Sequence, residues 1–214
     1  MVVLPPAKLG IMATWKEVTE QNPSHSENYA RRWKIMESQG QDIHGEARLV
    51  DAIAERESRI LDAGCGTGRL GGYLIEAGHT VVGTDLDPVL IGHAEHDHPQ
   101  GTWHVGDLSH DEIPEGDFDV AVSAGNVMGF LAPEGRETAL RNIHAAVKPG
   151  GRFIVGFGSG RGWDFTDFIA DAEKVGFVVD YRFGGWDLSP FNDSSTFLVA
   201  LFSRPGTTGG SLLA

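Results

Sequence analysis

Short apolar runs alternate with amphipathic helical patterns over most of the chain. The runs occupy 60–63, 80–84, 102–105, 118–123, 152–157, 177–183 and 196–202, and helical periodicity lies at 69–77, 88–96 and 134–147. Strands that alternate with helices pair in parallel, with helices on both faces of the sheet. The last two runs follow each other without a helix, which predicts an antiparallel pair. The pattern therefore predicts an α/β fold with a seven-stranded, mostly parallel sheet and an antiparallel last strand.

Two helices are predicted before the sheet begins. Ser24 and Glu27 have the spacing of a capping box, and Tyr29, Trp33 and Met36 follow at helical intervals. A second helical pattern covers 45–56. We expect a flexible N-terminal extension at 1–22, one domain at 23–204 (cap helices 23–57, core 58–204) and a flexible tail at 205–214. Met12 is a candidate alternative start, so the sequence leaves open whether residues 1–11 are native.

Composition narrows the classes of partner. The 214 residues are 41% hydrophobic and 22% charged, which is typical of one globular domain with a sizeable core. With 17 basic against 30 acidic side chains, the formal charge of −13 disfavours nucleic acid as the main substrate. A single cysteine excludes an internal disulfide and favours a reducing, cytoplasmic setting. No run approaches the ~20 apolar residues that span a bilayer, so we expect no membrane association; the oligomeric state is not indicated.

A glycine-rich loop follows the first predicted strand and precedes a helix. Gly64, Gly66 and Gly68 alternate there, so that backbone N–H groups can approach a ligand closely. The loop admits two classes of cofactor. Gly66, Gly68 and Gly71 also satisfy the dinucleotide fingerprint, and Asp85 lies where its ribose-binding acid belongs. An NAD(P)- or FAD-dependent oxidoreductase is therefore the main alternative.

Asp62 argues against a dinucleotide. It stands at the carboxyl end of the first strand, where its charge would repel a pyrophosphate and attract an ammonium group. The strand also ends two residues too early for Gly66 to be the first fingerprint glycine. The alternative role for Asp62 is to cap the following turn.

Three successive strands end in an aspartate: Asp62, Asp85 and Asp107. In an open parallel sheet, ligands bind outside these carboxyl ends. Asp85 can accept hydrogen bonds from both ribose hydroxyls. Asp107 can accept from the exocyclic amine of adenine, with Leu86 and Leu108 on either side of the base.

Taken in order, these motifs resemble those of the class I S-adenosylmethionine-dependent methyltransferases of the small-molecule type. The resemblance runs from about 59 to 157 and includes the first motif at 62–68, the acidic motif at 84–87, the third-strand motif at 106–108, the fourth strand with its loop at 118–127, and a helix with the fifth strand at 140–153. It implies a Rossmann-like fold and S-adenosyl-L-methionine as the cofactor. The residues it implies for cofactor binding are Tyr29, Asp62, Ala63, Gly64, Cys65, Gly66, Gly68, Asp85, Leu86, Asp107, Leu108 and Ser123.

The resemblance implies methyl transfer, here to a small-molecule oxygen or nitrogen acceptor by direct displacement, mainly through proximity and orientation. Asn126 and Phe130, in the loop after the fourth strand, and Trp163 and Trp186 further on are the candidates for the substrate side. Residues 123–126 can equally form only a tight turn. No catalytic base is assigned and no metal site is expected. A non-catalytic cofactor-binding module is the remaining alternative.

Overall fold

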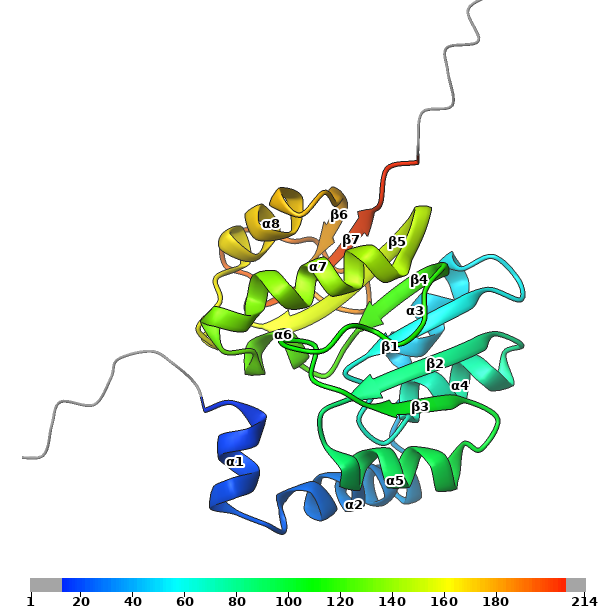
Figure 1. Ribbon diagram of the computed structural model, residues 1–214. Coiled ribbons are helices and arrows are strands. Elements are labelled where there is room, and N and C mark those ends of the chain that lie inside the picture. Colours follow the sequence, from blue (N-terminus) through cyan, green and yellow to red (C-terminus); the bar gives the residue numbers. More distant parts are fainter. Residues whose placement is uncertain (1–12, 207–214) are drawn as a thin grey trace, which may run out of the picture.

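The computed structural model describes residues 13–206, and its sheet has the predicted architecture (Figure 1). Seven strands lie in the order β3-β2-β1-β4-β5-β7-β6. Strands β1 to β5 pair in parallel, and β7 runs antiparallel to both β5 and β6. The predicted fold class is confirmed. The strands are β1 (Arg59–Ala63), β2 (Thr80–Asp85), β3 (Thr102–Val105), β4 (Phe118–Ser123), β5 (Val147–Gly158), β6 (Val178–Phe183) and β7 (Phe197–Ser203).

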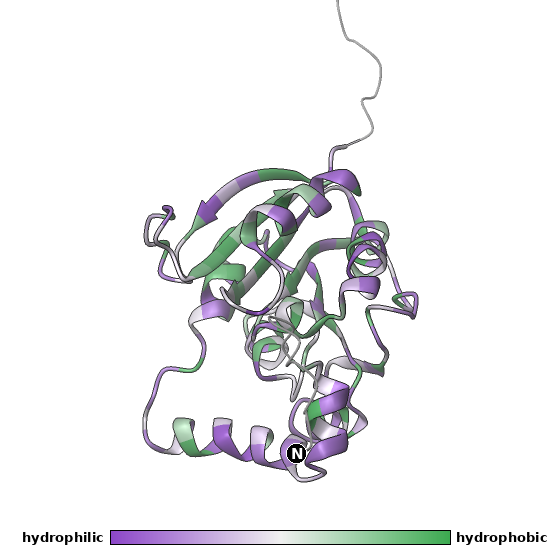
Figure 2. Ribbon diagram, turned by 90° about the vertical axis from the view of Figure 1, so that its left-hand side faces the viewer, coloured by the Kyte–Doolittle hydropathy of each residue, from purple (hydrophilic) through white to green (hydrophobic). Residues whose placement is uncertain are grey.

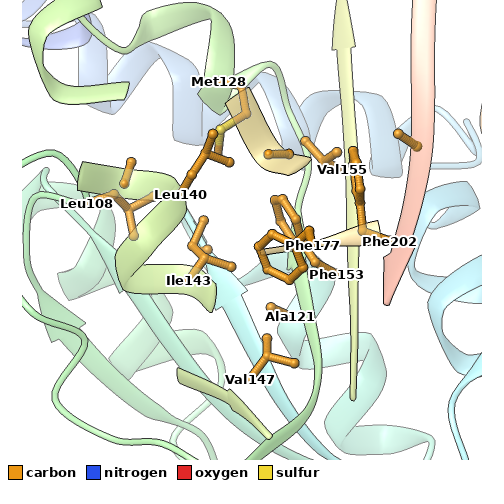
Figure 3. Packing of buried hydrophobic residues seen from close by; sticks show 14 of the residues in the cluster. Leu108, Ala121, Met128, Leu140, Ile143, Val147, Phe153, Val155, Phe177 and Phe202 are labelled. Atoms are coloured by element: carbon orange, nitrogen blue, oxygen red, sulfur yellow. The ribbon is translucent and has the colours of Figure 1, made fainter. Parts of the chain in front are cut away.

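Helices cover both faces of the sheet because the buried strands are apolar on both sides. On one face, α7 (Arg136–Ala146), α8 (Phe165–Lys174) and the short α6 (Val127–Phe130) pack over the aromatic side chains of Phe153, Phe177 and Phe202 (Figure 3). On the other face, α3 (Gly45–Ile53), α4 (Arg69–Glu76) and α5 (Pro88–Asp97) pack over a second apolar cluster. Figure 2 shows the apolar strands between helices with polar outer faces.

The N-terminal part differs from the prediction. The range 1–22, expected to be flexible, contains helix α1 (Trp15–Gln21), and Thr14 and Glu17 form its capping box. Ser24 precedes α2 (His25–Ser38) but makes no side-chain cap, and Glu27 instead contacts His93. The pair Thr14 and Glu17 and the pair Ser24 and Glu27 have the same capping-box spacing. The prediction chose the second pair, whereas the first pair forms the capping box. Residues 1–11 and most of the predicted tail lie outside the described residues.

The carboxyl ends of β1, β2 and β4 meet at one edge of the sheet, because β1 pairs with both of the others. The chain goes on from β1 to β2 on one side and reaches β4 on the other, so this edge is the topological switch point where ligands bind. Figure 1 shows that the strand arrowheads point towards the side on which α1 and α6 lie. Among the described residues, no helix has the length and apolarity to cross a membrane.

Candidate functional site

The glycine loop between β1 and α4 is shaped by its glycines. Gly64, Gly66 and Gly68 have φ of +85°, +56° and +74°, a backbone region that disfavours side chains. The N–H groups of Gly64 and Cys65 both donate to the carbonyl of Thr84, at 2.8 and 3.0 Å, which holds the loop against β2. A Cβ on Gly64 would lie 2.4 Å from Val127. The loop therefore approaches α6 closely at Gly64, where a side chain would not fit.

Asp62 is buried below this loop, with 2% of its surface exposed. Its Oδ2 has no hydrogen-bond partner among the described residues. Burial raises the pKa of this carboxyl to about 7, although Arg69 and the backbone N–H of Gly71 act to lower it. An unsatisfied buried carboxylate oxygen is costly, and native structures normally supply a donor. Asp62 therefore fits a ligand that brings an N–H group.

Asp85 supports the loop from the end of β2. Its Oδ2 accepts from the N–H of Gly66 and its Oδ1 from the N–H of Asp87, both at 2.9 Å. Burial raises the pKa of the Asp85 carboxyl to about 6. Each carboxylate oxygen keeps a second acceptor position, so the side chain can still receive two hydroxyl groups.

Two adjoining hollows lie over the loop. The first is mainly apolar. The space within the two hollows, including the part that is open to solvent, is about 530 Å³ for the first and about 320 Å³ for the second. Tyr29, Gly64, Ala124 and Gly125 line both, so the two hollows border each other. The first is lined in addition by Trp15, Gly66, Asp85, Leu86, Leu90, Val127, Phe130 and Leu131, and the second by Trp33, Asp62, Cys65, Thr67, Arg69 and Leu70.

Most of the predicted cofactor residues are brought together here: Tyr29, Asp62, Gly64, Cys65, Gly66, Asp85 and Leu86. The thiol of Cys65 is buried, and burial raises its pKa well above the ordinary value, which suits packing rather than thiolate chemistry. Ser123, at the end of β4, is 1% exposed, and its Oγ has no partner among the described residues. Ala63 is fully buried in the core, and Gly68 precedes α4.

Asp107 and Leu108, which were predicted to contact the adenine at the end of the third strand, lie away from the two hollows of the described chain. Leu108 is 6% exposed and packs in the core near Leu140 and Ile143 (Figure 3), so the expected sandwich of Leu86 and Leu108 is not present. Leu90, on α5, lines the first hollow in place of Leu108. Asp107 accepts from the N–H of Ser109 at 2.8 Å and does not line either hollow of the described chain.

The predicted substrate-side residues are divided between the hollow and the core. Phe130 lines the first hollow. Asn126 uses its Oδ1 to accept from the N–H of Gly158 at 2.8 Å, which ties the start of α6 to β5. Trp163 is buried in the core, with 2% of its surface exposed. Trp186 packs over Gly156 of β5. Neither tryptophan lines the two hollows of the described chain.

The sequence analysis missed several residues that line the hollows, and Trp15 and Arg69 are two of them. Trp15 lines the first hollow and lies in a segment without helical periodicity long enough to reveal α1. Arg69 lines the second hollow, with its guanidinium 4.1 Å from the ring centre of Trp33 and an ion pair to Glu46 at 3.2 Å. Arg69 directly follows the glycine loop in the sequence, and this position could have identified it as a residue of the site. In residues 13–206, no cluster of three or more His, Cys, Asp or Glu side chains could hold a metal ion.

Comparison with known proteins supports one family. A family model described as a methyltransferase domain matches residues 60–151. The crystal structure of a TehB-like SAM-dependent methyltransferase from Corynebacterium glutamicum is 60% identical, covers 86% of this chain and 100% of that one, and superposes with a TM-score of 0.84.

Two curated relatives are more distant. An uncharacterized methyltransferase of Synechocystis is 34% identical over 116 residues, which is 54% of this chain and 54% of that protein. The 18S rRNA (guanine-N(7))-methyltransferase of Bos taurus is 24% identical over 200 residues, covering 86% of this chain and 68% of the bovine enzyme. The match to the first of these thus spans about half of its length.

Proposed function

Because the chain belongs to the class I S-adenosylmethionine-dependent methyltransferases, we propose that it transfers the methyl group to an oxygen or nitrogen atom of a small molecule. The transfer is a direct displacement, and the enzyme acts mainly by proximity and orientation. The observation that carries the assignment of the site is the unpartnered oxygen of Asp62, buried beside the second hollow. An ammonium group, such as that of the methionine part of the cofactor, satisfies it.

The cofactor's other parts are assigned by the same reasoning. Asp85 would receive the ribose hydroxyls, and Leu86 and Leu90 would contact the adenine. Arg69, at the second hollow, is our candidate for the cofactor's carboxylate. The contact between Asp107 and the exocyclic amine of the adenine stays a prediction. Asp107 follows β3, which is the strand next to β2. A dinucleotide is not favoured, because Asp62 would repel its diphosphate.

The cofactor supplies a methyl group that its sulfonium already activates. The protein's contribution is to hold the acceptor in line and to exclude water, and orientation of this kind supplies ~7–11 kcal/mol in favourable cases. Val127, Phe130 and Leu131 form apolar walls suited to excluding water. Tyr29 stays neutral, because burial raises the pKa of its hydroxyl. We assign no general base.

A nucleic-acid acceptor is the second candidate, because the bovine relative methylates 18S rRNA. The net charge of −13 argues against it, since RNA binding requires neutralisation of several phosphates. A small molecule is therefore the better proposal, and the single cysteine supports a reducing, cytoplasmic setting.

Calorimetry tests the cofactor site. S-adenosylhomocysteine should bind to the wild type, and NAD⁺, NADP⁺ and FAD should not. Asp62→Asn should weaken S-adenosylhomocysteine at least about tenfold, because a neutral amide replaces the buried carboxylate that receives the ammonium. Asp193→Asn, an exposed aspartate far along the chain in the loop before β7, is the matched control and should bind normally. Dinucleotide binding without S-adenosylhomocysteine binding would refute the assignment.

The acceptor is sought separately. The enzyme is incubated with S-adenosylmethionine labelled in its methyl group and with a metabolite extract of small molecules or with total RNA. Mass spectrometry should find the label in a small molecule that lacks it when the enzyme is omitted. Label recovered only in RNA would refute the proposed acceptor class.

A further inference from the structure

Trp15 is anchored to Asp87, the N-cap residue of α5. Its Nε1–H donates to Oδ2 of Asp87 at 2.8 Å. The hydroxyl of Ser26 donates to the same oxygen, and the N–H of Val89 donates to Oδ1 at 2.9 Å. Asp87 is 5% exposed. Hydrogen bonds to a buried carboxylate are among the stronger ones in proteins. One carboxylate thus holds α1, α2 and α5 together.

The indole of Trp15 also fills the space between α2 and α6. Its ring centre lies 5.3 Å from that of Tyr29 and 5.7 Å from that of Phe130, with interplanar angles of 84° and 87°. These edge-to-face contacts are favourable beyond the area they bury. No residue of α1 is itself buried. Through these contacts, Trp15 holds α1 over the first hollow.

The walls of the first hollow carry little that could recognise an anion. Trp15, Phe130 and Leu131 line it without lining the second hollow, and among the described residues none of its lining side chains is Lys, Arg or His. Arg161 lies near, 5.5 Å from the ring centre of Phe130, but it packs on Gly129 and is not part of the lining. An acceptor with a carboxylate or a phosphate would leave that charge unpaired.

We propose that Trp15 selects the acceptor. Anchored by Asp87, it borders the part of the first hollow beside Phe130 and Leu131, next to the part beside Asp85, Leu86 and Leu90 that we assign to the adenosine. There it gives an apolar wall to a small, uncharged amine or alcohol with an aromatic or alkyl body. The inference rests on the proposed methyl transfer. The acceptor's lone pair forms the new bond to the methyl carbon, the methyl–sulfur bond breaks with its electron pair left on sulfur, and the acceptor's proton goes to water. During transfer to an amine, positive charge passes from sulfur to nitrogen, and aromatic rings attract cations at both stages.

Two probe acceptors separate charge from nucleophilicity. 4-Ethylaniline and 4-aminophenylacetate both present an uncharged aromatic amine at neutral pH, and they differ by a methyl against a carboxylate that a methylene insulates from the ring. The formation of S-adenosylhomocysteine is measured with each. The wild type should show a kcat/KM at least about tenfold higher for 4-ethylaniline, because the carboxylate finds no partner.

Variants of α1 then test Trp15 itself. Trp15→Phe keeps a ring and loses the hydrogen bond to Asp87, so KM for 4-ethylaniline should rise about tenfold with little change in kcat. Trp15→Ala should raise KM further and reduce the preference between the two probes. Lys16→Ala, an exposed neighbour on the same helix, should behave as the wild type. Thermal unfolding checks that each variant is folded, and calorimetry with S-adenosylhomocysteine checks its cofactor site.

The outcomes distinguish this inference from the proposed function. Equal use of the two probes, or an unchanged KM and preference in folded Trp15→Ala, would overturn the role of Trp15. Failure of both probes while S-adenosylhomocysteine still binds would overturn the acceptor class and leave the methyl-donor assignment intact. Failure of S-adenosylhomocysteine to bind to the wild type would instead overturn the proposed function.

Discussion

The carboxyl group of Asp62 is expected to make cofactor binding dependent on pH. Its pKa is about 7 in the free protein, because burial disfavours the charged form. If the ligand's ammonium pairs only with the ionised carboxylate, about half of the protein is competent at pH 7 and about 1% at pH 5. The contribution of Asp62 to the affinity for S-adenosylhomocysteine should therefore fall by roughly fiftyfold, or ~2.3 kcal/mol, between pH 7 and pH 5. The ligand's own amine stays protonated over this range.

Calorimetry from pH 5 to pH 7 measures this dependence. Asp62→Asn should remove most of the slope and leave the smaller part that belongs to Asp85, whose pKa is about 6. Asp193→Asn should reproduce the wild-type slope. A flat wild-type profile, or an identical slope in Asp62→Asn, would refute the pairing of Asp62 with the ammonium.

Three further expectations concern stability. The folded-state pKa of Asp62 is raised from 3.8 to about 7. The free protein should therefore lose up to roughly 4 kcal/mol between pH 4 and about pH 8 relative to Asp62→Asn, with no further difference at higher pH. Urea titrations of both proteins at each pH measure this loss, and parallel curves would contradict it. Gly64→Ala should destabilise by about 1–3 kcal/mol, since its Cβ would lie 2.4 Å from Val127 at a φ of +85°, and adding Val127→Ala should recover part of the loss in thermal unfolding. Phe153→Ala, at a fully buried position, should cost about 3–5 kcal/mol, whereas Tyr181→Ala, 63% exposed, should stay within about 0.5 kcal/mol; equal denaturant midpoints for these two variants would show that the core is misplaced.

The part of the site nearest the strand ends could be predicted from local sequence. Asp62, Gly64 and Asp85 lie where a buried strand passes into a loop, and parallel strands bring such loops to one edge. The same reasoning failed for Leu108, which follows a strand end but turns into the core. Whether a residue next to a strand end faces the ligand or the core depends on the turn that follows, and one sequence does not fix that turn.

Sequence by itself determined the chain order of the seven strands, the helices α4, α5 and α7 between them, the glycine loop and the acids that border it, because hydrophobic periodicity and covalent neighbourhood are local properties. Only the tertiary structure decided which aromatic side chains line the hollow. Trp163 and Trp186 pack away from it, whereas Trp15 lines it through a hydrogen bond to Asp87, 72 residues away in the chain. An aromatic ring gains from burial in either place, so its location depends on how distant elements pack around it.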